Sequence, residues 1–116
     1  MRLVNQGKKE LASERFSRAA HQLQGAIEID SSNPFAYFYL GLARFRSTRF
    51  AEAADLFQRA SDLFGEMTNW KADSLAFRGE SLEKMNRMAE AHRSFEDALL
   101  IDPQNSRADE GLKRVH

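Results

Sequence analysis

The residues that could carry acid–base or metal chemistry are few, and their spacing does not suit that chemistry. The chain has three histidines and no cysteine. Because His21, His92 and His116 form no HExxH pair, the sequence does not indicate a zinc site. Because there is no cysteine, it does not indicate a thiolate nucleophile either. Adjacent acids such as Glu96 and Asp97 do not face each other on a helix, and the sequence has neither a strand–serine–helix elbow nor a glycine-rich phosphate loop. We therefore predict no catalytic residue, no cofactor and no metal, and we do not expect an enzyme.

Aromatic residues at helical spacing indicate a different chemistry, the binding of a partner. Phe35, Phe38, Leu42 and Phe45 follow one another at intervals of three, four and three residues, with Tyr39 beside them. They therefore share one side of a helix. The opposite side of this helix is apolar as well, and a helix that is apolar nearly all round is expected to be buried on more than one side.

Three arginines lie close together at the end of this segment. Arg44, Arg46 and Arg49 could capture a carboxylate or a phosphate. A cluster of charges is also typical of a solvated edge, where ion pairs contribute little. We therefore favour the solvated edge, with capture of an anion as the alternative.

The charge balance bears on the class of partner. Lys plus Arg and Asp plus Glu both number 17 among the 116 residues. This balance disfavours a nucleic-acid partner, because such affinity comes largely from neutralised phosphates. No apolar run approaches the ~18 residues of a membrane span, and the first residues lack the apolar core of a signal peptide. We expect a cytoplasmic protein, with the periplasm as the alternative if the sequence is a mature or excised fragment.

The elements that must position these side chains repeat along the chain. Gly7, Gly41 and Gly79 are spaced 34 and then 38 residues apart. Four further columns share these two intervals, namely Phe16, Phe50 and Met88; Ala19, Ala53 and Ala91; Leu23, Phe57 and Phe95; and Ala26, Ala60 and Ala98. A repeat of this length predicts a stack of supersecondary units, none of which can bury its apolar face alone.

Each repeating unit is expected to be a pair of helices. Apolar residues recur at helical spacing, β-branched residues are few, and no alternating strand pattern is present. Asn33 and Pro34 predict a helix start, and Ser106 with Asp109 resembles a capping box that opens the last helix. We predict seven helices, at about 2–13, 15–30, 34–47, 49–64, 68–85, 87–101 and 106–115.

The repeated residues resemble the tetratricopeptide repeat, a helix–turn–helix unit. The second unit carries Leu40, Gly41, Ala53, Phe57 and Ala60 of that signature. In the first unit Gln6 replaces the usual leucine, while Ser31 and Gly65 stand where Pro103 supplies the proline of the family. The resemblance implies an all-α, right-handed superhelical solenoid of antiparallel helix pairs. It implies one domain, with repeats at 1–33, 34–71 and 72–105 and a capping helix at 106–116.

The longer second interval places four additional residues within residues 64–71. Four residues are about one helical turn, so they form either a further turn of helix or a longer loop. If the fifth helix starts near residue 68, Trp70 shares a face with Asp73, Phe77 and Glu80. Trp70 then extends the wall of whatever that face lines.

In tetratricopeptide arrays the first helix of each repeat lines a concave groove, so the resemblance implies that part of the aromatic stripe faces such a groove. The candidate partner-binding residues are Val4, Lys8, Phe35, Phe38, Tyr39, Leu42, Arg46, Trp70, Asp73, Phe77 and Glu80. The predicted groove is apolar and aromatic over its first two-thirds and acidic over its last third. It would complement a segment with large apolar anchors and at least one basic residue. The competing explanation is that packing between neighbouring first helices buries Phe38 and Leu42.

One subtype of the family grips the C-terminal carboxylate of a chaperone tail with lysine, asparagine and arginine side chains. The matching positions here are Val4, Lys8, Tyr39, Asp73 and Phe77. An acid and an aromatic replace two of the basic residues, and Lys8 and Tyr39 replace the two asparagines. Chaperone tails are therefore not expected as ligands.

Two functions are compatible with these features. The first is a non-catalytic module that binds a peptide or a helical segment of another protein. The second is self-association or scaffold formation, through the groove or through the N-terminal end, where no polar helix caps the first repeat. A helical-repeat reader of RNA is disfavoured by the neutral charge and by the acids of the groove.

Overall fold

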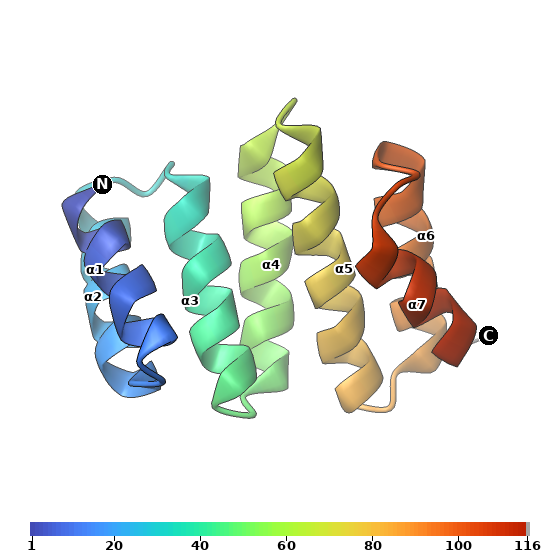
Figure 1. Ribbon diagram of the computed structural model, residues 1–116, viewed down its shortest axis with the longest axis horizontal. Coiled ribbons are helices and arrows are strands. Elements are labelled where there is room, and N and C mark those ends of the chain that lie inside the picture. The colour runs from blue at the N-terminus through green and yellow to red at the C-terminus, as the bar shows by residue number, and fades with distance from the viewer. Residues whose placement is uncertain (116) are drawn as a thin grey trace.

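The computed structural model describes residues 1–115, which form seven α-helices and no strand. The helices are α1 (Arg2–Ala12), α2 (Phe16–Ile29), α3 (Pro34–Arg46), α4 (Phe50–Phe64), α5 (Thr68–Lys84), α6 (Met88–Ile101) and α7 (Ser106–Val115). Successive helices pack on each other, and the two chain ends lie at opposite ends of the array (Figure 1). The predicted all-α fold with seven helices is confirmed. Residue 116, which ends the predicted capping segment and is one of the three histidines, lies outside the described residues.

The turn within each helix pair has the same backbone geometry. Glu14, Thr48 and Asn86, which are spaced 34 and 38 residues apart, have φ values of 60°, 60° and 61°. The amide of the following residue then reaches a carbonyl five residues back, as in the 2.8 Å bond from Arg15 N to Glu10 O. This bond satisfies one of the free carbonyls at the end of the first helix. The repeat is therefore as regular in its turns as in its helices.

Asparagine side chains cap the N-termini of α3 and α7. Asn33 Oδ1 accepts the amide of Phe35 at 3.0 Å, with Pro34 at the first helical position. Asn105 Oδ1 accepts the amide of Ala108 at 2.9 Å. The residue that caps α7 is thus Asn105, and the predicted capping box of Ser106 and Asp109 is wrong.

Glycine lets the two helices of each pair approach closely. A Cβ built on Gly41 would lie 2.8 Å from Cε1 of Phe57, which is fully buried. A Cβ on Gly79 would lie 2.6 Å from Phe95 in the same way. The large ring of one helix therefore occupies the space that the glycine of its partner leaves open.

The fifth helix differs from its counterpart in the preceding repeat. α5 has 17 residues and α3 has 13. α5 begins 34 residues after α3, whereas Gly79 follows Gly41 by 38. These positions place the four additional residues in an extra first turn of α5. None of the described helices, α5 included, is long and apolar enough to cross a bilayer.

Candidate functional site

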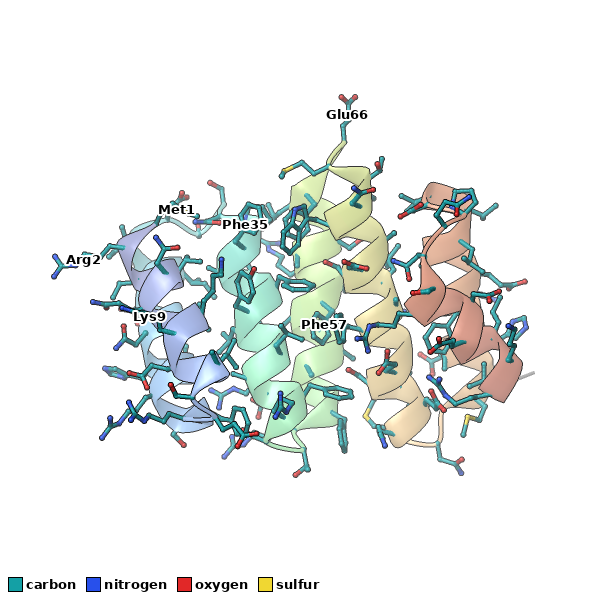
Figure 2. All side chains as sticks on the ribbon, in the orientation of Figure 1. Met1, Arg2, Lys9, Phe35, Phe57 and Glu66 are labelled. Carbon is teal, nitrogen blue, oxygen red and sulfur yellow. The ribbon has the colours of Figure 1, made fainter. Side chains whose placement is uncertain are left out.

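Nine aromatic side chains from α3, α4 and α5 form one connected group, here called the aromatic cluster. Its members are Phe35, Phe38, Tyr39, Phe45, Phe50, Phe57, Phe64, Trp70 and Phe77. Neighbouring ring centroids lie between 5.0 and 6.5 Å apart, the range in which aromatic pairs attract beyond simple burial. Because α3 and α5 scarcely pack backbone to backbone, these rings fill the space between them. Figure 2 shows Phe35 near one end of α3 and Phe57 near the middle of the array.

Two of the predicted groove residues are buried. Phe38 is only 4% exposed, with the rings of Tyr39, Phe57, Phe64, Trp70 and Phe77 between 5.3 and 6.2 Å away. Val4 is 1% exposed and packs in one group with Ala26 and Ala36. The prediction that these two side chains line an open groove is therefore corrected. Rings of the neighbouring first helix α5, together with rings of α4, cover Phe38. The competing explanation therefore holds for Phe38, whereas Leu42 stays half-buried.

Four other predicted residues stay half-buried at the surface of α3 and α5. They are Phe35, Tyr39, Leu42 and Trp70, and are here called the aromatic patch. Trp70 stacks on Phe64 at 5.8 Å with an interplanar angle of 20°, and meets Phe35 edge to face at 5.0 Å. The extra turn of α5 thus contributes the largest side chain of the patch, held rigidly from two sides.

The two predicted cations of the groove lie in different surroundings. Lys8 is exposed, and its Nζ lies 5.3 Å from the ring centroid of Tyr39, so a cation from α1 borders the aromatic patch. The guanidinium of Arg46 lies 4.9 Å from the ring of Phe16, and its Nη2 donates to Glu14 Oε1 at 3.2 Å. Arg46 therefore contacts the turn between α1 and α2, and its place in the groove stays a prediction.

The remaining members of the arginine cluster are also paired within the chain. Arg44 lies 3.2 Å and Arg49 lies 3.5 Å from carboxylate oxygens of Glu52. Glu52 thus serves as the anion for both side chains. This arrangement favours the interpretation of the cluster as an edge of internal ion pairs.

Phe77 is covered on both faces of its ring. Phe57 stacks on one face at 5.4 Å and 20°. The guanidinium carbon of Arg107, from the first turn of α7, lies 4.1 Å from the Phe77 ring centroid. Since the stacked Phe57 takes one face, the cation takes the other, and a partner approaching Phe77 would meet Arg107 first.

Beside the aromatic cluster, α5 and α7 enclose a hollow of about 700 Å³, here called the α5–α7 cleft. Its ionisable lining residues are the acids Asp73, Glu80, Glu83, Asp102 and Glu110 and the bases Lys84, Arg107 and Arg114. Five acids against three bases leave the lining with an excess of two negative charges.

Three of these acids are paired with the chain's own C-terminal segment. Asn105 Nδ2 donates to Asp73 Oδ1 at 2.7 Å, Arg107 Nη1 to Glu80 Oε2 at 2.7 Å, and Arg114 Nε to Glu83 Oε2 at 2.9 Å. The hydrogen bonds to Glu83 also raise the pKa of Arg114 above its ordinary value. The acids that the sequence analysis assigned to the last third of the groove are therefore paired within the chain.

Sequence reasoning missed Arg107 and Arg114 as residues of this site. They lie seven residues apart, so two helical turns separate them on one face. That spacing matches a pairing with Glu80 and Glu83, which lie one turn apart on the facing helix. This spacing was visible in the sequence, but the last helix was expected only to cap the array and not to contribute residues to the site.

A second hollow, of about 530 Å³, lies at the N-terminal end of the array. Its apolar lining residues are Met1, Leu3, Val4, Ala26 and Ile29. Met1 is 68% exposed and Ile29 is 79% exposed. The first helix pair therefore presents uncovered apolar surface at this end of the array.

Comparisons with known proteins place the chain in a family. The protein-family model described as the tetratricopeptide repeat matches residues 4–66, more than half of the chain. A search of curated proteins finds no match.

Several solved structures share the fold. The second TPR domain of human RPAP3, solved in complex with an HSP70 peptide, is 22% identical with a TM-score of 0.87, covering 96% of this chain and 89% of that one. The Arabidopsis OM64 TPR domain is 22% identical with a TM-score of 0.89, covering 97% and 90%. The Yersinia enterocolitica type III secretion chaperone SycD, solved with a peptide of the translocator YopD, is 14% identical with a TM-score of 0.86, covering 98% and 89%. These likenesses confirm the expected superhelical fold.

Proposed function

Since this chain belongs to the tetratricopeptide repeat family, we propose that it is a non-catalytic interaction module that binds a peptide or helical segment of another protein. The observation that carries the proposal is the aromatic patch lying next to the α5–α7 cleft on the first helices. The RPAP3 domain and SycD, which share the fold, are both solved with bound peptides. A peptide is therefore the class of partner to test first.

The aromatic patch supplies the anchors. Trp70 and Tyr39 are large, half-buried and held by neighbouring rings. Such residues dominate the binding energy of many protein interfaces, because they bury much area at a low cost in side-chain entropy. An apolar side chain of the partner is expected to pack against Trp70, with Tyr39 and Lys8 bordering the contact.

The α5–α7 cleft supplies a preference for charge. Its five acids and three bases favour a basic residue of the partner over an acidic one. The preferred segment therefore combines an apolar anchor with at least one basic residue a few positions away.

We propose that chaperone tails bind this surface only weakly. Five positions match those with which one subtype of the family grips the carboxylate of a chaperone tail. Of these, Val4 is buried, Asp73 is bonded to Asn105, and Phe77 is covered by Arg107. A titration with the HSP70 peptide that the RPAP3 domain binds tests this point. Binding as tight as that of a selected apolar–basic peptide would overturn it.

The main test uses peptides selected from a random display library on the wild-type chain. Trp70→Ala and Tyr39→Ala are each expected to weaken the best peptide by about tenfold or more, as for truncation of an anchor residue. Gln24→Ala, at an exposed position of α2, is the matched control and leaves binding unchanged. Folded Trp70 and Tyr39 variants that bind as tightly as the wild type would contradict the proposed groove.

Self-association is the second candidate, and the N-terminal hollow favours it. Ile29 and Met1 are exposed there beside apolar lining residues, and a second copy could cover them. Light scattering from micromolar to near-millimolar protein gives the mass directly, and 13.3 kDa at every concentration would exclude this candidate. If a larger species forms, Ile29→Glu is expected to dissociate it.

A further inference from the structure

The arginine at the start of α7 occupies a position with the features of a ligand site. Its guanidinium lies 4.1 Å from the centroid of Phe77, on the face that Phe57 leaves open. Its Nη1 donates to Glu80 Oε2 at 2.7 Å. A guanidinium over a ring, with a carboxylate bonded to one of its nitrogens, combines a cation–π contact with an ion pair.

The receiving side of this contact is less exposed than the arginine. The Glu80 side chain is 17% exposed, whereas the Arg107 side chain is 45% exposed. Phe77 is fixed by the aromatic cluster through Phe57 and Phe38. The ring and the carboxylate both lie on α5, three residues apart, so the two side chains share one side of the same helix.

The docking of α7 does not depend on Arg107. The buried residues of α7 are Ala108, Gly111 and Val115. Asn105 caps the helix and also bonds to Asp73. Removing the guanidinium from the ring therefore leaves these contacts of α7 in place.

The cleft beside this contact has the room and the charge for a second cation. The hollow of about 700 Å³ adjoins Phe77 and Glu80, and its lining carries two more acids than bases. Two further acids line it, the half-buried Asp102 at the end of α6 and the exposed Glu110 on α7. An incoming guanidinium is thus attracted to the place where Arg107 already lies.

From these contacts we infer that Phe77 and Glu80 form a guanidinium-binding subsite, which Arg107 fills in the free chain and an arginine of the partner takes over. This inference rests on the proposed function, because it names arginine as the basic residue of the bound segment. Arg107 is then an internal competitor, and the apparent affinity for the partner is lower by the fraction of molecules in which the subsite is closed.

The second ion pair of α7 provides a matched control. Arg114 donates to Glu83 through two nitrogens, at 2.9 and 3.0 Å, but no aromatic ring lies against it among the described contacts of residues 1–115. Removing Arg114 exposes a carboxylate of the same helix without exposing the face of Phe77. Only the loss of Arg107 should open a guanidinium subsite.

The test is an NMR titration with N-acetyl-arginine N-methylamide as the probe, read on the ring signals of Phe77 and the amide of Glu80. In Arg107→Ala the probe is expected to shift these signals at about tenfold lower concentration than in the wild type. Arg114→Ala is expected to behave like the wild type. Adding Glu80→Gln to Arg107→Ala is expected to abolish the gain, and the norleucine analogue of the probe should shift nothing.

The inference is wrong if the probe shifts no signal of Phe77 in folded Arg107→Ala. It is also wrong if Arg114→Ala binds the probe as much more tightly than the wild type as Arg107→Ala does. Should Arg107→Ala lose helicity, Arg107→Gln, which retains the stem of the side chain, replaces it in the same titration. The probe does not touch the aromatic patch, so this outcome is independent of the Trp70 and Tyr39 experiments. If the probe binds Arg107→Ala as expected while the Trp70 and Tyr39 variants bind the selected peptide like the wild type, the subsite is supported and the proposed groove is wrong.

Discussion

A single turn residue, Ser32, lowers the pKa of the Asp30 carboxyl group. Asp30 Oδ1 accepts the backbone amide of Ser32 at 3.0 Å and its hydroxyl at 2.6 Å. The bond from the Ser32 side chain, followed by that from its amide, lowers the pKa of Asp30 below its ordinary value. Both bonds favour the ionised carboxylate in the folded chain.

Replacing Ser32 by alanine is expected to raise the pKa of Asp30 towards its ordinary value, because the largest cause of the shift is removed. A depressed pKa in the folded state means stability that is present above the unfolded pKa and lost as pH falls through the folded one. The difference between wild type and Ser32→Ala should therefore be seen near neutral pH and vanish in strong acid. An NMR titration of Asp30 measures the pKa, with Ser31→Ala as a control that leaves it unchanged.

Thr48 holds a backbone conformation that suits its side chain poorly. Its φ is 60°, and a β-branched residue is rare in the left-handed region. Thr48→Gly is expected to stabilise the fold by about 1 kcal/mol, because the steric cost at Cβ disappears.

Asn86, with the same geometry in the third repeat, is the control for Thr48. Asparagine tolerates this region, so Asn86→Gly should change the free energy of unfolding less. Urea denaturation of both variants decides the point. A less stable Thr48→Gly would show that its hydroxyl bond to Ser47 O, at 2.6 Å, outweighs the strain.

At the scale of the elements, the close approach of α3 and α4 depends on one missing methyl group. The Cβ of an alanine at position 41 would lie 2.8 Å from the buried ring of Phe57. Gly41→Ala is expected to destabilise the chain by about 1–3 kcal/mol, although alanine favours helix more than glycine does.

Gly25→Ala, where α2 faces α1, is the matched control for Gly41→Ala. Its Cβ would meet only the flexible end of Leu3, at 3.2 Å. The gain in helix propensity should then make Gly25→Ala neutral or stabilising in thermal unfolding. A Gly41→Ala as stable as the wild type would mean that the Phe57 ring moves freely.

The helices were predictable because their end signals are local. Asn33 and Pro34 mark the start of α3, and the predicted range 34–47 differs from the observed helix only at its last residue. The left-handed turn residues were not predicted, because Glu14 and Thr48 are not the residue types that signal such a turn. Their geometry follows from the packing of the helix pair.

The candidate site was less predictable than the helices. The periodicity placed Phe38 on the correct side of α3, but it says nothing of the rings that α4 and α5 bring against that side. The same limit applies to Arg107, whose partners Phe77 and Glu80 lie on another helix. Contacts between helices depend on their spacing in the array, which no single helix pattern encodes.

At the scale of the whole molecule, stability is expected to vary along the array. Among the described helices α1 packs chiefly on α2 and α3, and its buried residues are Val4 and Gly7. α4 packs on both α3 and α5, and its rings Phe57 and Phe64 belong to the aromatic cluster. In a stack of nearest-neighbour contacts, an end helix opens before a central one.

Native-state hydrogen exchange is the measurement for this gradient. Amides of α1 are expected to exchange at least about tenfold faster than those of α4, through local opening of the end pair. Ile29→Glu, on the exposed surface of α2, serves as a control that leaves the exchange of α4 unchanged. Equal protection in α1 and α4 would mean that the array opens only as one unit.

The position of Trp70 also gives the protein a built-in optical signal. It is the only tryptophan of the chain, and it lies in ring contact with Phe35, Phe38 and Phe64 and 6.4 Å from Tyr39. Light absorbed by Tyr39 can pass to the indole, whose emission reports the polarity around the aromatic patch alone. A partner that binds at the aromatic patch is expected to change the wavelength and intensity of this emission, so binding can be followed without a label.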